Sequence, residues 1–206
     1  MRAANFGQVR VGAPLAVDGQ SIGLLGGSFN PPHTGHVQIT EIALRRLRLD
    51  QVWWIVTPGN PLKQNSNLPP LQDRLEACSR LLDHPRVKFT GFEQNLGTSF
   101  TAATVGYLKQ RLPGVNFVWI MGADNLVSFH RWQRWQEIAG QVPIAVIDRP
   151  GWRLRALASP AARRLHSAFV PEQRAGLLAQ LAPPAWTLIS GPLSSLSSTA
   201  LRTARS

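Results

Sequence analysis

The chain has 206 residues, a net charge of +11, 44% hydrophobic residues and 16% charged residues. This length predicts one domain spanning residues 1–206, and the apolar and charged shares are typical of a soluble globular protein. No apolar run is long enough to cross a bilayer, and residues 1–20 lack the continuous apolar segment of a signal peptide. The single cysteine, Cys78, excludes an internal disulfide and is consistent with a cytoplasmic location.

The positive charge first suggests a nucleic-acid ligand, but a set of anionic small substrates is the alternative. The arginines are scattered, apart from local groups at 45–48 and 153–164, and the sequence shows no aromatic-basic platform for bases. We therefore expect neither a nucleic-acid partner nor a membrane partner. A regulatory or RNA-associated nucleotide-binding protein is kept as an alternative class.

Segments typical of strands alternate with segments typical of helices along the chain. We predict strands at Ile22–Leu25, Gln51–Thr57, Val87–Thr90, Asn116–Met121, Pro143–Ile147 and Trp186–Ile189. We predict helices at Gly35–Arg48, Leu71–Leu82, Thr101–Arg111, within Asn125–Ala139 and from Thr199. The third of these helices has Ser99 or Thr101 available as its cap. The alternation favours an α/β domain with a doubly wound parallel sheet and helices on both faces.

Three segments interrupt this pattern. Residues 1–20 are expected to form a frayed extension before the first strand. Residues 58–70 are rich in Pro and Asn, which predicts a loop. Residues 151–184 are rich in Arg, Ala and Pro, and we expect a partly helical insertion or a mobile lid there.

A glycine-rich turn with two histidines joins the first strand to the first helix, in the run Gly26-Gly27-Ser28-Phe29-Asn30-Pro31-Pro32-His33-Thr34-Gly35-His36. Glycines let the backbone approach an anion closely, and the free N–H groups of a helix start face such an anion. The two histidines can add proton-dependent charge and hydrogen bonds. The run predicts a phosphate-binding corner, and it matches neither the Walker loop nor the dinucleotide-binding glycine pattern. The alternative is a plain turn with two surface histidines.

A second candidate phosphate ligand lies near the C-terminus, where Ser197, Ser198 and Thr199 precede Arg202. Hydroxyls that open a helix can cap it or bind phosphate. Arg202 is on the same side of the first turn as Thr199 and offers a planar fork to a phosphate. The alternative is a capped helix with an exposed arginine.

These two segments resemble the His-x-Gly-His and Ile-Ser-Ser-Thr-x-x-Arg signatures of the HxGH nucleotidyltransferase superfamily, with Leu196 in place of the isoleucine. The resemblance implies a Rossmann-like nucleotidyltransferase fold and transfer of a nucleotidyl group from a nucleoside triphosphate to a phosphate acceptor. It implies that His33, His36 and Arg202 are catalytic. It implies ATP binding by Gly26, Gly27, Ser28, Phe29, His33, His36, Ser197, Ser198, Thr199 and Arg202.

Three further segments resemble the bacterial nicotinate mononucleotide adenylyltransferase family. They are Gly122-Ala123-Asp124-Asn125-Leu126 with Phe129 and Trp132, the run Thr98-Ser99-Phe100-Thr101-Ala102-Ala103-Thr104, and the loop Pro58-Gly59-Asn60-Pro61-Leu62-Lys63. The resemblance implies that Asp124 binds ribose hydroxyls, Trp132 stacks on the pyridine ring, Thr101 lies at the carboxylate and Lys63 reaches a phosphate. The alternatives are a helix cap for Asp124 and a solvated loop residue for Lys63.

The resemblance covers residues 22–150 and 188–202 and implies one reaction. ATP and nicotinate mononucleotide would give nicotinate adenine dinucleotide and pyrophosphate, by direct attack without a covalent intermediate. Mg²⁺ would be carried by ATP, so no protein metal site is expected. Pantetheine-phosphate adenylyltransferase, of the same superfamily, is the nearest alternative, although the segments around Asp124 and Thr101 do not fit it.

Overall fold

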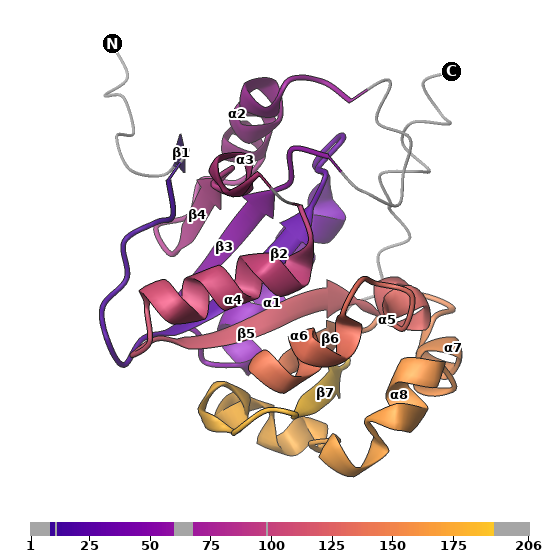
Figure 1. The fold of residues 1–206 in the computed structure, drawn as a ribbon. Coiled ribbons are helices and arrows are strands. Elements are labelled where there is room, and N and C mark those ends of the chain that lie inside the picture. The colour runs from indigo at the N-terminus through magenta and orange to yellow at the C-terminus, as the bar shows by residue number, and fades with distance from the viewer. Residues whose placement is uncertain (1–8, 11, 60–67, 98, 192–206) are drawn as a thin grey trace.

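The computed structural model describes residues 9–10, 12–59, 68–97 and 99–191. Within these ranges, seven parallel strands form one sheet in the order β1-β4-β3-β2-β5-β6-β7 (Figure 1). Their bounds are β1 Val9–Arg10, β2 Ser21–Gly27, β3 Gln51–Val56, β4 Val87–Thr90, β5 Asn116–Gly122, β6 Ile144–Ile147 and β7 Trp186–Ile189.

The inner strands are apolar almost throughout because both faces of the sheet are covered. Residues 52–56 of β3 and 117–122 of β5 are all buried. Side chains alternate between the two faces of a strand, so Trp53 and Trp54 belong to different core clusters on opposite sides of the sheet. A continuous apolar run is what a strand buried on both faces requires.

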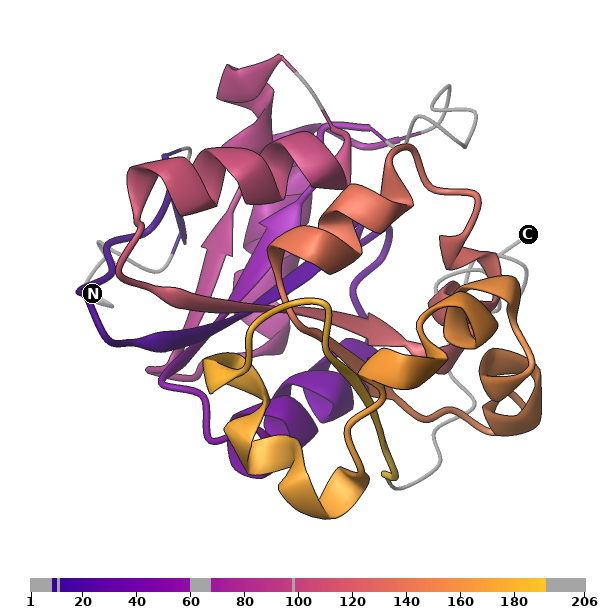
Figure 2. The ribbon, with the colours of Figure 1, turned by 60° about the horizontal axis from the view of Figure 1, so that its bottom comes forward.

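Helices cover both faces of this sheet. Their bounds are α1 Thr34–Arg46, α2 Leu71–Leu81, α3 Glu93–Leu96, α4 Thr101–Arg111, α5 Ala123–Phe129, α6 Trp135–Gln141, α7 Arg153–Leu157, α8 Pro160–Arg164, and the 3₁₀ segments η1 His166–Ala168 and η2 Glu172–Gln180. Figure 2 shows α4 and α6 on one side of the sheet and α1 and η2 on the other. Among the described helices, none combines the length and hydropathy that a bilayer span requires.

Most of the predicted elements are present within one or two residues, but two expectations need correction. Residues 9–10 are not frayed, since β1 pairs with β4 at the sheet edge and Thr90 Oγ1 donates to the carbonyl of Gly12 at 3.0 Å. Neither Ser99 nor Thr101 caps α4, because its N-cap residue is Phe100. Residues 58–59 and 68–70 form a loop, as predicted.

The segment 151–184 consists mainly of helical turns that pack on the rest of the molecule. Ala156, Ala161 and Leu178 are fully buried in the two core clusters. The segment is therefore partly helical, as predicted, and motion as a lid stays a prediction.

Cys78 also packs in the core from α2, and burial raises the pKa of its thiol, which argues against a nucleophilic role.

The strand order reverses beside β2. The chain runs from β2 to β3 and β4 on one side, then returns to place β5, β6 and β7 on the other. Because all strands are parallel, the ends of β2 at Gly27 and β5 at Gly122 lie at the same edge of the sheet. Ligands of doubly wound sheets bind at this edge, at the point of reversal. The fold therefore places the predicted phosphate corner beside the segment that contains Asp124.

Candidate active site

The turn after β2 is held by aromatic packing. Phe29 has φ of +46°, and its ring is fully buried and stacked on Trp54 with centroids 4.9 Å apart. A Cβ at Gly26 would lie 2.6 Å from Cη2 of Trp119, so a side chain at this position would displace that indole. Phe29, predicted to bind ATP, therefore anchors the turn with its ring and leaves only its backbone for a ligand.

His33 and His36 form a reciprocal cap at the start of α1. The N–H of Gly35 donates to Nδ1 of His33 at 3.1 Å, and the N–H of His33 donates to Nδ1 of His36 at 3.2 Å. The two rings are close, with centroids 3.9 Å apart. Each Nδ1 accepts a hydrogen bond, so the proton of each neutral ring sits on Nε2. The sequence analysis expected all N–H groups at this helix start to be free for an anion. This expectation is wrong for Gly35, because its N–H donates to His33.

Both histidines are neutral at physiological pH in this free form. Burial, together with the nearby charge of Arg149 and against a smaller opposing effect of Asp124, lowers the pKa of His33 to about 4. Burial also lowers the pKa of His36 to about 3, with smaller effects from His33 and Arg149. The sequence suggested proton-dependent charge here, but the structure provides two neutral Nε2–H donors instead. A bound polyphosphate would favour the protonated forms and raise both pKa values.

Asp124 and Arg149 come from neighbouring strand ends and face this corner. Asp124 follows β5, and its Oδ1 lies 3.3 Å from Nε of Arg149, which follows β6. Because β5 pairs with both β2 and β6, these two residues lie at the strand ends next to the histidine turn, and both charges act on the pKa of His33. The N-cap residue of α5 is Gly122, so the helix-cap alternative for Asp124 is wrong.

Arg149 is a candidate site residue that the sequence analysis missed. Its position two residues after the apolar run Pro143–Ile147 was the available signal, since ligands of such sheets bind beyond the strand ends. Gly122 makes room for the pair, because a Cβ there would clash with Oδ1 of Asp124 and approach Nε of Arg149 to 2.8 Å.

Trp132 lies on the same side of the sheet as Trp119 and is half-buried. Its ring meets Trp119 at 6.3 Å and Phe129 at 5.4 Å between centroids, both at steep angles. Trp119 also packs on Gly26, so a single indole connects Trp132 to the glycine turn. The structure therefore brings Trp132 close to the turn that carries the histidines, and its role in stacking stays a prediction.

The start of α4 has no side-chain cap. The carbonyl of Phe100 accepts from Ala103 and Thr104, while the side chain of Phe100 caps nothing. No acidic residue occupies the first turn. Thr104 instead donates to Oε1 of buried Glu93 at 2.5 Å, which ties α4 to α3. Burial raises the pKa of Glu93, a second buried group that the sequence analysis did not identify. A helix start of this kind suits a carboxylate at Thr101.

Comparison with known proteins identifies the family. The family model described as "Cytidylyltransferase-like" matches residues 24–204. The "Probable nicotinate-nucleotide adenylyltransferase" of Agrobacterium fabrum is 59% identical over 181 residues, which covers 88% of this chain and 97% of that protein. The protein of the same name from Rhizobium meliloti is 56% identical, covering 90% of this chain and 99% of its own length. This chain belongs to the nicotinate-nucleotide adenylyltransferase family.

Solved structures agree on the fold of this adenylyltransferase family member. The "Plasmodium falciparum nicotinic acid mononucleotide adenylyltransferase complexed with APC" superposes with a TM-score of 0.66 at 14% identity. The match covers 89% of this chain and 83% of that one. The corresponding complex with NaAD gives a TM-score of 0.65. The predicted Rossmann-like nucleotidyltransferase fold is confirmed, as is the family resemblance.

Part of the predicted adenylyltransferase site lies outside the described residues. These positions are Lys63, Ser197, Ser198, Thr199 and Arg202. The helix predicted from Thr199 is outside them as well. Their roles stay predictions.

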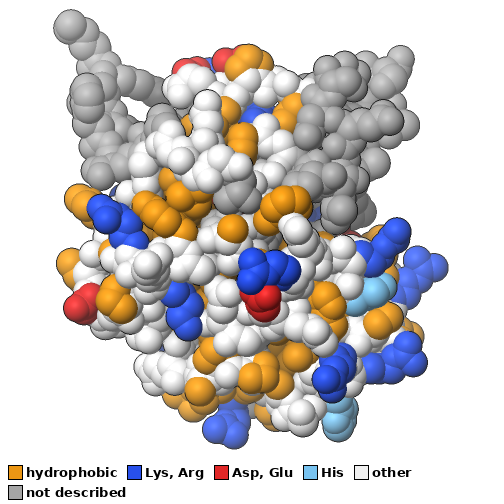
Figure 3. All heavy atoms as spheres, in the orientation of Figure 1, with side chains coloured by type: hydrophobic (Ala, Val, Ile, Leu, Met, Phe, Trp, Pro, Cys, Tyr) orange, Lys and Arg blue, Asp and Glu red, His pale blue; other side chains and the backbone are white. Residues whose placement is uncertain are grey.

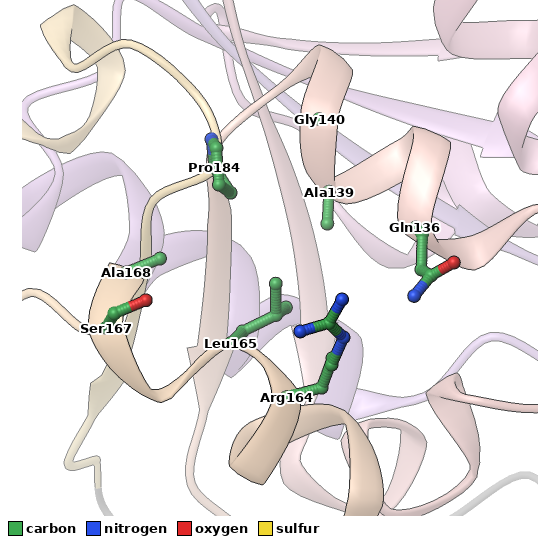
Figure 4. A pocket seen from close by; sticks show the side chains of 8 residues that line it. All are labelled: Gln136, Ala139, Gly140, Arg164, Leu165, Ser167, Ala168 and Pro184. Atoms are coloured by element: carbon green, nitrogen blue, oxygen red, sulfur yellow. The ribbon is translucent and has the colours of Figure 1, made fainter.

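A separate hollow of about 400 Å³ lies between α6, the α8–η1 segment and Pro184 (Figure 4). It is lined by Gln136, Ala139, Gly140, Arg164, Leu165, Ser167, Ala168 and Pro184. None of these is a predicted site residue, and we assign the hollow no part in adenylyl transfer.

Lys and Arg side chains gather on the side of the molecule where α7 and α8 lie, on the right of Figure 3.

Proposed function

We propose that this chain transfers the adenylyl group of ATP to nicotinate mononucleotide, giving nicotinate adenine dinucleotide and pyrophosphate. The observation that carries this proposal is the pair of neutral imidazoles beside Asp124 and Arg149, at the reversal point of the sheet. Membership of the nicotinate-nucleotide adenylyltransferase family supports the choice of substrates.

The reaction needs positioning and charge stabilisation rather than a nucleophilic side chain. A phosphate oxygen of the mononucleotide attacks the α-phosphorus of ATP, the bond to the bridging oxygen breaks, and pyrophosphate leaves. His33 and His36 donate from Nε2 to oxygens of the reacting phosphates, and Arg149 contributes positive charge. Donors that are already oriented where charge develops stabilise the transition state most.

The acceptor lies between Trp132 and the start of α4. Trp132 stacks on the pyridine ring, and the backbone N–H groups near Thr101 hold its carboxylate. Asp124 accepts hydrogen bonds from ribose hydroxyls, held in place by Arg149. The half-buried position of Trp132 beside Trp119 supports this arrangement. Preference for the acid over the amide follows from charge-assisted hydrogen bonds to the carboxylate, which are about twice as strong as neutral ones.

The outer phosphates are assigned to the C-terminal signature. Ser197, Ser198, Thr199 and the fork of Arg202 hold the leaving pyrophosphate, and Gly26, Gly27 and Ser28 line the other side of the triphosphate. Lys63 reaches the phosphate of the mononucleotide. These assignments rest on the motifs.

Mg²⁺ enters with ATP in this proposal and neutralises charge on the phosphates. Magnesium keeps several waters and binds substrate phosphates with few protein ligands. In the part of the chain that the structure describes, no group of three or more His, Cys, Asp or Glu side chains could hold a metal ion. The carboxylate that faces the histidines, Asp124, is paired with Arg149.

One assay tests the proposal. Purified protein is supplied with ATP, Mg²⁺ and each of three acceptors: nicotinate mononucleotide, nicotinamide mononucleotide and phosphopantetheine, while pyrophosphate release is followed. We expect the largest kcat/KM for nicotinate mononucleotide. Preference for phosphopantetheine would favour pantetheine-phosphate adenylyltransferase. No transfer, combined with salt-dependent RNA binding, would favour the RNA-associated alternative.

A further inference from the structure

Arg74 is a buried cation whose partners are carbonyl groups. It lies on α2, and its side chain is only 3% exposed. Nε donates to the carbonyl of Pro69 at 2.9 Å, and Nη1 donates to those of Ser28 at 2.9 Å and Thr57 at 2.7 Å. The described residues provide no ion pair to it. Burying a charge without a counter-ion costs folding free energy. An arginine at this position is therefore expected to have a role that offsets this cost.

The three carbonyls come from segments that meet behind the phosphate corner. Ser28 directly follows β2, Thr57 directly follows β3, and Pro69 precedes α2. The N–H of Thr57 also donates to the carbonyl of Gly27 at 3.0 Å. One guanidinium thus fastens the ends of two neighbouring strands to the start of a helix. A planar guanidinium with several donors can satisfy three carbonyls at once, whereas an ammonium is a compact point charge.

The bond to Ser28 fixes the direction of a backbone donor in the corner. A trans peptide is planar, so its carbonyl and its N–H point in opposite directions. With the Ser28 carbonyl turned to Arg74, the N–H of Phe29 points away from Arg74. Phe29 has φ of +46°, a region that bulky side chains rarely adopt, and stacking on Trp54 holds its ring.

We propose that Arg74 is a positioning residue, which turns the Ser28–Phe29 peptide so that the N–H of Phe29 meets a phosphate. This inference rests on the proposed adenylyl transfer at the corner. Arg74 itself lies behind the turn and touches no substrate. Because its partners are neutral carbonyls, its positive charge is not cancelled and adds to the attraction for the anion.

Arg74→Lys and Arg74→Ala test the role, with Leu75→Ala as the matched control. Leu75 is the next residue of α2, is equally buried and packs in the same core cluster as Phe29, so its truncation removes core packing without releasing the Ser28 carbonyl. We expect Arg74→Lys to fold and to lose at least about tenfold in kcat, because a single ammonium cannot hold all three carbonyls. Leu75→Ala should lower Tm while kcat of the folded protein stays within about twofold.

A second readout observes the peptide directly. In protein labelled with ¹⁵N-phenylalanine, inorganic pyrophosphate should shift the Phe29 amide resonance of the wild type. Arg74→Lys should reduce that shift by at least about half, while Leu75→Ala should leave it unchanged, because Arg74 binds the Ser28 carbonyl and Leu75 does not.

The outcomes separate this inference from the proposed function. An inactive wild type would contradict adenylyl transfer itself. An active wild type with normal kcat in both Arg74 variants would overturn the positioning role. So would equal losses of kcat in Arg74→Lys and Leu75→Ala, an unchanged Phe29 shift, or an Arg74→Lys chain that cannot fold, since each would make Arg74 only part of the scaffold.

Discussion

His33 and His36 use the same nitrogen atoms to hold the helix start and to fix their own tautomers. Each Nδ1 accepts from a backbone N–H, so each ring presents Nε2–H outward. Protonation of either Nδ1 would break a capping bond, which opposes charging in addition to burial. The free corner therefore offers oriented neutral donors, and positive charge comes from Arg149.

Histidine titration by NMR tests this description of the two residues. Burial and the neighbouring positive charges lower the pKa to about 4 for His33 and about 3 for His36. We expect long-range ¹H–¹⁵N spectra near neutral pH to show both rings as the neutral Nε2–H tautomer, with titration midpoints below about pH 5. A midpoint near the ordinary histidine value for both rings would contradict the capping arrangement.

At the scale of elements, the site depends on what directly follows each strand. The strands Val87–Thr90 and Trp186–Ile189 were predicted with their exact bounds, because both are short runs rich in β-branched and aromatic residues. β1 was missed because two residues give no periodicity. Arg149 was missed because its partner Asp124 follows a different strand, and a pairing across strands leaves no pattern in the sequence.

Gly122→Ala tests the pairing of these two strand ends. Its methyl group would clash with Oδ1 of Asp124 and approach Nε of Arg149 to 2.8 Å, so the ion pair must move. We expect kcat/KM to fall at least about tenfold, a loss of about 1.4 kcal/mol of transition-state stabilisation.

Gly140→Ala is the control for this substitution, because a Cβ there meets nothing within 4 Å. It should leave kcat/KM unchanged and raise stability slightly, by about 0.5–1 kcal/mol, since alanine favours a helix. Equal activity in the two variants would show that the Asp124–Arg149 pair has no bearing on the reaction.

For the whole molecule, the sequence predicted the fold class and the glycine–histidine turn between the first strand and the first helix, because glycines, histidines and apolar runs are local signals. It could not predict the protonation of His33 and His36 or the burial of Glu93, because both depend on packing between distant segments. These same groups couple the stability of the fold to pH, and they do so with opposite signs.

The histidines make the folded state less stable in acid. Their pKa values are about 4 and about 3 when folded and about 6.5 when unfolded, so the unfolded chain binds more protons between these values. Stability is therefore lost as pH falls from neutral towards pH 4. Burial raises the pKa of Glu93, so its contribution to stability changes with pH in the opposite direction to that of the histidines. Glu93 is present in both the wild type and the His33→Asn variant, so its effect cancels when the two are compared.

His33→Asn isolates the histidine contribution, because asparagine caps a helix without titrating. Between about pH 7.5 and pH 5, we expect the Tm of the wild type to fall by roughly 2–6 °C more than that of His33→Asn, from about 1–2 kcal/mol of lost stability. The measurement is calorimetry of both proteins in matched buffers. An identical drop in the two proteins would mean that His33 is not buried in its neutral form.

The central claim is that the histidine corner transfers the adenylyl group of ATP to nicotinate mononucleotide. The most direct measurement is single-turnover formation of nicotinate adenine dinucleotide by wild type and His36→Ala, with the Kd for ATP determined in parallel. We expect equal amounts of dinucleotide and pyrophosphate from the wild type. In His36→Ala, turnover should fall at least about a hundredfold while the Kd for ATP changes by less than about fivefold, because the imidazole acts mainly in the transition state. Turnover within tenfold of the wild type, or no dinucleotide from the wild type, would contradict the claim.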